Sequence, residues 1–253
     1  MNISLTKSQG PLSGSLLMIG GGKITASIRR VADFLSGGPN SIWVTIPTAA
    51  EDRFLDLAVK PGNLPAIMRR PFTILHTRDR EEADTEEFVE ALHEATAVWF
   101  FGGRQWRLVD AYKETRTERE IRHLLDRGGL IAGTSAGATI QGSYLVRGAP
   151  EGNHIMMATG HEEGFGFVSN VVIDQHIDTR RREFDLATVI TRYPNLLGLG
   201  IDERTAILVQ RNIAAVIGGG RVLVTDGHSH DGLPFFALLV GDRFDLATWT
   251  RSA

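Results

Sequence analysis

"LIAGTSAGATI", Leu130 to Ile140, runs from apolar residues through a serine between two glycines into a series of small residues. Gly133, Ser135 and Gly137 complete the pattern G-x-S-x-G, with a buried strand expected before the turn and a short helix after it. A serine on such a sharp turn has a strained backbone, so the flanking residues must be small. This context favours a catalytic role for Ser135, as a nucleophile, over a purely structural role in a Gly-Ser turn.

The sequence around this turn alternates short apolar runs with longer amphipathic ones, which is the pattern of parallel strands joined by crossover helices. A helical stripe covers Ile24 to Leu35, and Asp84 with Glu87 and Thr117 with Glu120 resemble capping boxes that open the next helices. The expected strands are Ser15 to Ile19, Ile42 to Ile46, Phe72 to Leu75, Ala97 to Phe101, Leu130 to Gly133 and Val171 to Asp174.

After residue 195 the pattern changes to closely spaced strands joined by Gly-rich turns, as in an antiparallel edge. These strands are expected at Ala206 to Val209, Ala214 to Ile217, Arg221 to Thr225 and Phe235 to Val240. No linker or repeat divides the sequence, so we expect one α/β domain over residues 1–253.

Composition limits the possible functions. The chain has 253 residues and a net charge of −3, so it lacks the excess of positive charge that is typical of nucleic-acid-binding proteins, and no nucleic-acid partner is expected. No apolar run approaches the ~20 residues of a membrane helix, and the amino terminus lacks the features of a signal peptide, so a cytoplasmic protein without membrane contact is expected. The count of zero cysteines excludes disulfides, thiolate metal ligands and a cysteine nucleophile.

A serine nucleophile needs a base and a carboxylate that orients it. His176, in "VVIDQHIDTRRR", is the preferred base because it ends an apolar strand, and His76 is the second choice. We interpret "TDGHSHDG", with His228 and His230, as a solvated loop and not as a metal site, because no third ligand is obvious. No metal is therefore expected. For the carboxylate, Glu151 lies between Ser135 and His176, while Asp174 and Asp202 remain alternatives.

Two strand-glycine junctions complete the expected site. In "VWFFGGRQW", the strand ends in Gly102-Gly103, where backbone N–H groups can approach an oxyanion, and the N–H of Ala136 after the serine offers another donor. In "LLMIGGGKI", the pattern G-x-G-x-x-G fails because Thr25 occupies the third glycine position, so this junction indicates a tight turn rather than a nucleotide site.

The segments "IGGG", "FFGGRQ", "GTSAGA", "DQH" and "GLGIDERTAILV" occur in this order, and the chain resembles the cyanophycinases and related aspartyl dipeptidases over roughly residues 15–225. The resemblance implies a flavodoxin-like, three-layer α/β/α sandwich of the class I glutamine amidotransferase type, with a mostly parallel sheet. It also implies a Ser-His-Glu triad, no cofactor and a possible homodimer. Because amidotransferases use cysteine at the turn, the absence of cysteine favours the peptidase branch.

Matched position by position, the resemblance assigns the nucleophile to Ser135, the base to His176 and the acid to Glu151. It assigns the oxyanion donors to Gly103 and Ala136, and substrate binding to Gln105, Gln175, Arg180 and Arg182.

Two positions depart from the family pattern: Arg104 replaces the usual acid, and Asp185 replaces an expected arginine. We therefore expect an acidic or isopeptide-linked peptide, of the β-aspartyl-arginine type, with cyanophycin as one candidate. Two alternatives remain. An α/β-hydrolase-like esterase or amidase would place its base nearer the chain end than His176. A non-catalytic binding module on the same fold would leave Ser135 unreactive.

Overall fold

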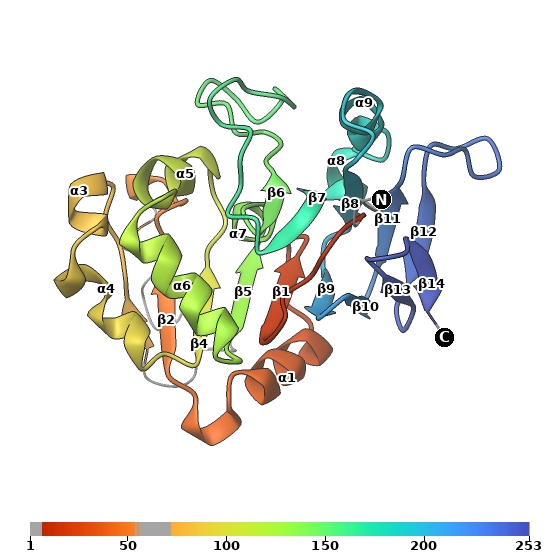
Figure 1. Cartoon of the computed structure of the whole chain (residues 1–253). Helices are drawn as coiled ribbons and strands as arrows, with labels where there is room; N and C mark the ends of the chain where they lie inside the picture. The colour runs from red at the N-terminus through yellow and green to blue at the C-terminus, as the bar shows by residue number, and fades with distance from the viewer. Residues whose placement is uncertain (1–6, 54, 56–71, 253) are drawn as a thin grey trace, which may run out of the picture.

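The computed structural model describes residues 7–53, 55 and 72–252. Two β-sheets form its frame (Figure 1). The larger sheet has nine strands in the order β14-β13-β10-β9-β1-β5-β4-β2-β3. Its strands are β1 (Ser15–Ile19), β2 (Trp43–Ile46), β3 (Phe72–Ile74), β4 (Ala97–Phe100), β5 (Leu130–Thr134), β9 (Thr205–Gln210), β10 (Ile213–Gly218), β13 (Arg243–Asp245) and β14 (Thr250–Ser252).

The larger sheet combines a parallel half with an antiparallel half. β1, β5, β4, β2 and β3 pair in parallel, whereas β9 pairs antiparallel with both β1 and β10. Parallel strands need crossover connections, and antiparallel neighbours need only short turns. The expected α/β fold with a mostly parallel sheet and antiparallel C-terminal strands is therefore confirmed.

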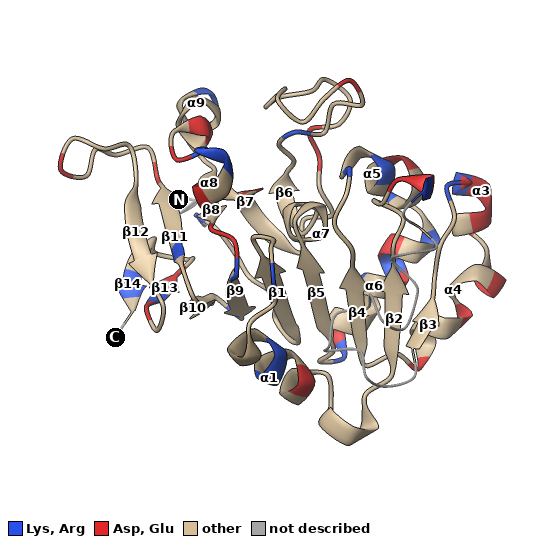
Figure 2. Ribbon diagram, turned by 180° about the vertical axis from the view of Figure 1, so that it is seen from behind, with Lys and Arg blue, Asp and Glu red and all other residues tan. Residues whose placement is uncertain are grey.

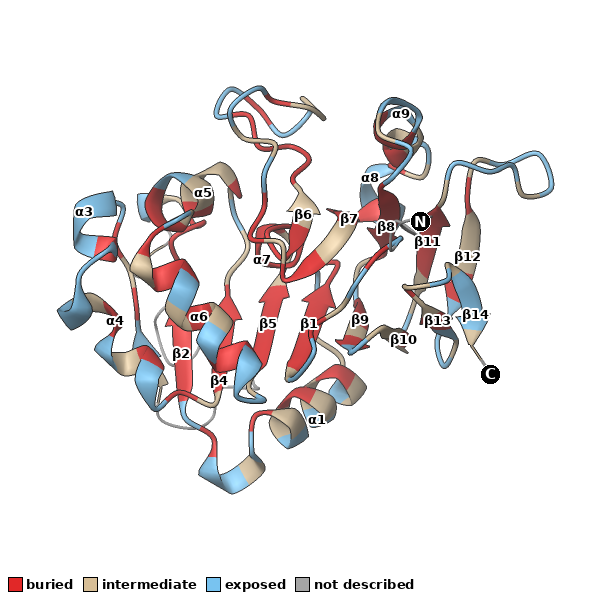
Figure 3. Ribbon diagram, viewed as in Figure 1, coloured by how far each residue is buried: buried red, intermediate tan, exposed pale blue. Residues whose placement is uncertain are grey.

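Helices cover both faces of the parallel half. Alternate side chains of β1 point to opposite faces: Leu17 packs with α1 (Ala26–Leu35), and Leu16 packs in the cluster that includes α4 (Glu86–His93) and α6 (Arg116–Asp126). Figure 3 shows β1, β2, β4 and β5 of this half largely buried and the outer surfaces of α4 and α6 exposed. The smaller helical elements here are η1 (Gly38–Asn40), α3 (Arg80–Ala83), α5 (Trp106–Tyr112) and α7 (Ala136–Thr139).

The smaller sheet was not anticipated as a separate unit. Its order is β12-β11-β8-β7-β6, with β6–β7–β8 parallel and β8–β11–β12 antiparallel. The chain leaves β10 through Gly218, whose φ of 117° suits glycine, and β11 then pairs with β8 instead of extending the larger sheet. Its elements are β6 (Gly142–Tyr144), β7 (Val168–Gln175), β8 (Leu197–Ile201), β11 (Arg221–Thr225), β12 (Phe236–Leu239), α8 (Ile177–Arg180) and α9 (Asp185–Arg192).

Both expected capping boxes were wrong by one or two residues. The N-cap of α4 is Thr85, whose hydroxyl accepts from the N–H of Phe88, while Asp84 accepts from the N–H of Arg116. The N-cap of α6 is Thr115, and Thr117 lies inside the helix, where its hydroxyl donates to a carbonyl of α3. Each N-cap candidate had a threonine nearby in the sequence, and tertiary contacts decided between them.

The carboxyl ends of β4 and β5, from the larger sheet, lie beside the carboxyl ends of β7 and β8, from the smaller one (Figure 1). Parallel sheets place their functional residues at this edge. Among the residues that the structure describes, no helix has the length and apolar character that crossing a membrane requires.

Candidate active site

Ser135 lies at a strained strand-to-helix turn between β5 and α7. Its φ of 54° and ψ of −116° are unfavourable for a residue with a side chain. A Cβ at Gly133 would lie 2.2 Å from the carbonyl oxygen of Gly137, and one at Gly137 would lie 2.3 Å from that of Phe100. The glycines are therefore required by close backbone packing, as the sequence indicated. Ser135 itself is only partly buried.

The side chain of His176 meets the serine. Its Nε2 lies 2.9 Å from Ser135 Oγ. His176 follows the end of β7 with a φ of 57°, so it turns away from the strand direction and toward the larger sheet. The serine and the histidine thus come from different sheets and lie within proton-transfer distance.

The carboxylate beside the histidine is Glu203, which follows β8. Glu203 Oε1 lies 2.6 Å from His176 Nδ1. A carboxylate only accepts hydrogen bonds when ionised, so Nδ1–H donates to it, Nε2 becomes an acceptor and the hydroxyl of Ser135 donates to Nε2.

The expected pairing of His176 with Glu151 was therefore wrong, as were both alternatives. Glu151 is an exposed residue of the connection between β6 and β7. Asp174 is fully buried and paired with Arg147, and Asp202 binds the backbone and side chain of Arg221. Asp202 directly follows β8, and Glu203 lies in the turn between β8 and β9. The signal in "GIDE" was its second carboxylate, which could have been weighed beside Asp202.

Glu203 is itself held by α8, which follows His176. The N–H of Glu203 donates to Asp178 Oδ1 at 2.9 Å, and Thr179 Oγ1 donates to Glu203 Oε1 at 3.2 Å. The single-turn helix after the histidine therefore orients the carboxylate that faces the histidine ring.

Ser135, His176 and Glu203 form what we call the serine cluster. The end of β1 holds the three segments that carry these residues, because three successive backbone carbonyls each accept an N–H at 2.9 Å from a different segment. The pairs are Ser135 N–H to Ile19 O, His176 N–H to Gly20 O, and Arg204 N–H to Gly21 O.

The glycines of "IGGG" are explained by the same contacts. A Cβ at Gly21 would lie 2.2 Å from Cε1 of His176, and one at Gly22 would lie 2.6 Å from Oε2 of Glu203. Both glycines also have positive φ, 118° and 67°. This junction is the tight turn that the sequence favoured, and its backbone packs against the imidazole.

The two expected oxyanion donors lie beside Ser135. Ala136 is the first residue of α7, where backbone N–H groups have no partner within the helix. Gly102 lies close enough that an added Cβ would be 3.2 Å from Ser135 Cβ, and Gly103 follows it with a φ of 146°. Gly103 packs so closely against Ala49 that an added Cβ would lie 2.0 Å from Ala49 O. The backbone of Ala49 thus restricts the conformation of Gly103.

Three of the four residues expected to bind substrate, Gln105, Gln175 and Arg182, are buried, and hydrogen bonds within the protein occupy polar groups of all three. Gln105 donates to Val146 O at 2.8 Å, and Arg182 donates to Gln175 O at 3.1 Å. Arg180, by contrast, is exposed on α8. Figure 2 shows basic residues on α8 and on α5 at this edge of the sheets.

The environment of His176 favours its neutral form. Burial lowers the pKa of His176 below its ordinary value, and the positive charge of Arg180 lowers it further, while the hydrogen bond to Glu203 opposes both. A neutral imidazole is the form that can accept a proton from Ser135.

The side chains of His76 and His230 have other partners. His76 Nδ1 lies 2.8 Å from Thr48 Oγ1, and His230 Nε2 lies 2.9 Å from Asp226 Oδ1. Within the described residues, no three His, Asp or Glu side chains form a group that could hold a metal ion.

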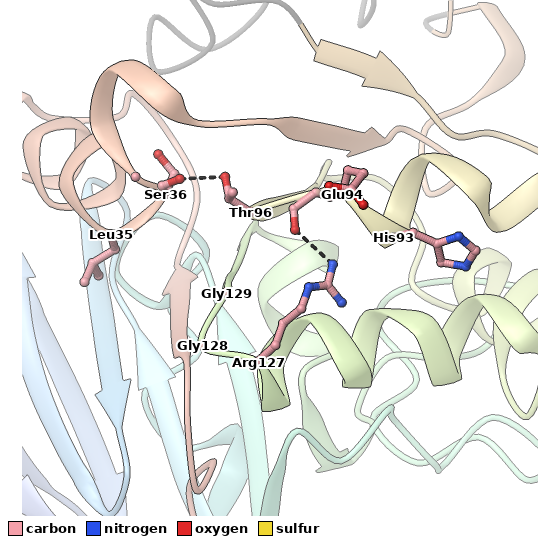
Figure 4. A pocket seen from close by; sticks show the side chains of 10 residues that line it. Leu35, Ser36, His93, Glu94, Thr96, Arg127, Gly128 and Gly129 are labelled. Atoms are coloured by element: carbon pink, nitrogen blue, oxygen red, sulfur yellow. Dashed lines mark hydrogen bonds between the residues drawn. The ribbon is translucent and has the colours of Figure 1, made fainter.

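A groove of about 450 Å³ lies at the opposite end of the larger sheet (Figure 4). Thr96 and Gly129, which line it, precede β4 and β5, whereas Ser135 follows β5. The guanidinium of Arg127 in this groove donates to the carbonyls of Leu92 and Ala95 and so caps α4. This groove is separate from the serine cluster.

Comparison with known proteins gives the family. The model of Peptidase family S51 matches residues 16–217. The chain belongs to peptidase family S51. The family and the cyanophycinases among its relatives make the chain a serine-type peptidase, a hydrolase.

The S51 relatives include several cyanophycinases. The chain is 29% identical to the cyanophycinase of Geminocystis herdmanii (strain PCC 6308) over 230 residues, which cover 86% of this chain and 82% of that protein. It is also 29% identical to the cyanophycinase of Nostoc sp. (strain PCC 7120 / SAG 25.82 / UTEX 2576), over 84% of this chain and 73% of that one.

Solved structures show the same architecture. A peptidase from an acI-B1 Actinobacterium superposes with a TM-score of 0.72 at 26% identity, covering 94% of this chain and 98% of that one. A putative Peptidase E protein from Listeria monocytogenes EGD-e has a TM-score of 0.54 at 18% identity, over 83% of this chain and 97% of that one, and supports the fold alone. The resemblance read from the sequence motifs is thereby confirmed.

Proposed function

We propose that this S51 peptidase hydrolyses its substrate through an acyl-enzyme on Ser135, with His176 as the base and Glu203 as the orienting acid. The observation that carries the proposal is the continuous hydrogen-bonded chain from Ser135 Oγ through the imidazole to the Glu203 carboxylate. That order of nucleophile, base and acid defines a serine hydrolase triad by geometry.

In the acylation step, Ser135 Oγ attacks the substrate carbonyl carbon while His176 Nε2 takes the hydroxyl proton. The negative oxygen of the tetrahedral intermediate is stabilised by the N–H groups of Gly103 and Ala136. The intermediate collapses as Nε2 returns the proton to the leaving amine, and the acyl group remains on Ser135.

Deacylation repeats these steps with water. His176 Nε2 takes a proton from water as the water oxygen attacks the acyl carbon, and then returns that proton to Ser135 Oγ. A free carboxylic acid leaves, and the hydroxyl is restored. Throughout, Glu203 holds the Nδ1–H and stabilises the imidazolium.

For the substrate we propose an acidic or isopeptide-linked peptide of the β-aspartyl type. The relatives named cyanophycinase support this class. The exposed guanidinium of Arg180, close enough to affect the pKa of His176, supplies a positive charge beside the site that suits a substrate carboxylate. Asp185 pairs with Arg147, so the position that departs from the family pattern supplies no guanidinium to a substrate.

Labelling with a fluorophosphonate probe tests the nucleophile. The wild-type chain should label, and Ser135→Ala should not. Ser143→Ala is a matched control, because Ser143 also has a partly buried hydroxyl but binds the backbone of Val171. Equal labelling of Ser135→Ala and wild type would refute the proposed nucleophile.

Substrate class is then tested by incubation with cyanophycin, with β-aspartyl dipeptides and with a simple ester. We expect cleavage of at least one β-aspartyl substrate. Cleavage of the ester alone would identify an esterase instead, and absence of labelling and of all cleavage would identify a binding module.

A further inference from the structure

The long connection between β6 and β7 is fixed to the rest of the protein along its length. In Figure 1 it rises beyond the end of β6, next to the edge where the serine cluster lies. A connection from residue 145 to residue 167 is long, and ordered loops of such length are commonly functional. At its start, Gln105 Nε2 donates to Val146 O at 2.8 Å, and Arg104 Nη2 donates to Ala149 O at 2.6 Å. These two contacts join the segment to the turn that carries Gly103.

Between these two anchors, Arg147 points to the other side of the site. Its Nε and Nη2 donate to the two oxygens of Asp174 at 2.9 and 2.8 Å, and the side chains are 3% and 0% exposed. Its Nη2 also donates to Asp185 at 2.6 Å, and its Nη1 donates to Asn153 O at 2.9 Å. One guanidinium therefore connects the segment to β7 and to α9.

The contact with Asp174 continues to the base. Asp174 Oδ1 accepts from the N–H of Gln175 at 2.9 Å, and Arg182 donates to the carbonyl of Gln175 at 3.1 Å. The backbone N–H and carbonyl of Gln175, the residue preceding His176, are thus held by this network. The network therefore links Arg147 to the segment that carries the base.

We propose that residues 146–150 form a strut between the two halves of the catalytic site, with Arg147 as a positioning residue. The strut fixes the spacing between Gly103, on the larger sheet, and His176, on the smaller one. This inference rests on the proposed function, because it assigns those two residues to the oxyanion and the base.

The geometry of Arg147 explains why an arginine is required. A bidentate guanidinium fork fixes both the distance and the angle to Asp174, whereas a lysine supplies the same charge at a single point. Arg147→Lys therefore retains charge neutralisation of the buried carboxylate and loses the fixed geometry. A displacement of about 1 Å between catalytic groups is enough for about a 100-fold loss in rate.

The test measures the rate of Ser135 labelling by a fluorophosphonate probe well below the unfolding temperature of each variant. For Arg147→Lys we expect labelling slower by about 10- to 100-fold with circular dichroism unchanged. The control is Arg122→Lys: Arg122 holds Phe165 O at the far end of the same connection, away from Asp174, and its loss should leave the rate unchanged. A rate for Arg147→Lys within about twofold of wild type, or an equal loss in the control, overturns the proposal.

A double variant separates a strut from simple stabilisation. Gln105→Leu cuts the opposite end of the strut, so its effect on the rate should be strongly non-additive with that of Arg147→Lys. Additive effects overturn the proposal. If Arg147→Lys does not fold, Asp185→Asn removes only the partner that is 38% exposed and should give a smaller loss in the same direction. An unchanged rate there would also refute the strut.

A second measurement does not depend on activity. Cleavage after Glu151 by a glutamate-specific endoproteinase, followed by mass spectrometry, reports release of the segment. We expect cleavage at this site at least about tenfold faster in Arg147→Lys than in wild type or Arg122→Lys, because local opening controls cleavage. Equal rates overturn the strut. If wild type does not label, the proposed function fails while this measurement still decides the strut.

Discussion

Gly21 packs directly against the imidazole of His176: a Cβ at Gly21 would lie 2.2 Å from Cε1 and 2.6 Å from Nδ1 of the ring. The carbonyl of Gly21 and that of the preceding Gly20 also bind the backbone of the segments carrying Glu203 and His176. One glycine-rich turn thus determines both where the histidine ring lies and which carboxylate it meets.

Replacing this glycine should therefore impair catalysis. In Gly21→Ala the methyl group would displace the ring from Ser135, and the positive φ of 118° adds backbone strain. We expect at least about a 100-fold loss in the rate of fluorophosphonate labelling. Gly38→Ala, where an added Cβ meets nothing within 4 Å and φ is 56°, controls for backbone strain alone. Wild-type labelling by Gly21→Ala would contradict the close packing.

Glu203 should matter and Glu151 should not. In Glu203→Gln the amide can no longer stabilise the imidazolium, and its NH₂ can select the wrong tautomer, so turnover should fall by about 10⁴-fold. Glu151→Gln changes an exposed side chain and should stay within about twofold of wild type. The two variants are compared by kcat on a cleaved β-aspartyl substrate, and the reverse ranking would restore Glu151 as the acid.

Arg180 should influence how the rate of Ser135 labelling depends on pH. Its charge lowers the pKa of His176, so Arg180→Gln should raise that pKa. Because only the neutral imidazole accepts the serine proton, the fall in labelling rate on the acid side (the acid limb) should move to higher pH. An uncharged probe removes any effect on substrate binding. Arg181→Gln is the matched control. Since Arg180 is exposed, added salt should shift the wild-type limb in the same direction, and an unmoved limb in both cases would contradict the assignment.

The strain at Ser135 should be measurable as stability. Ser135→Gly relieves an unfavourable backbone conformation, so the free energy of unfolding should rise by about 1–3 kcal/mol while labelling is abolished. Arg211→Gly, at another positive φ of 50°, should gain a smaller amount and keep its activity. Urea unfolding of both variants gives the comparison. A destabilised Ser135→Gly would show that the turn carries no such strain.

The sequence predicted the fold and the pair Ser135 and His176 because both depend on local signals. Apolar runs and glycine positions identified the strand-turn-helix around Ser135, and the end of an apolar strand identified His176. Glu203 was missed because chain order suggested a residue between the two, whereas β8 is paired in parallel beside β7 and brings the later segment to the ring. Register between strands is a tertiary property that a single sequence does not show.

The binding residues were harder to predict for the same reason. Gln105, Gln175 and Arg182 were expected to contact substrate, but polar groups of all three are engaged in the buried contacts that support the site. The single domain over residues 1–253, the homodimer, the cytoplasmic location and the absence of nucleic-acid contacts, cofactors and metals stay predictions.

The division of the proposed triad between two sheets makes reactivity depend on both sheets being folded. Ile19, in β1, accepts the N–H of Ser135, and Glu203 follows β8, which pairs with β7 in the second sheet. A half-unfolded chain in which β8 has separated from β7 therefore lacks the carboxylate that faces His176. Such a chain keeps Ser135 but loses the group that holds its base in position.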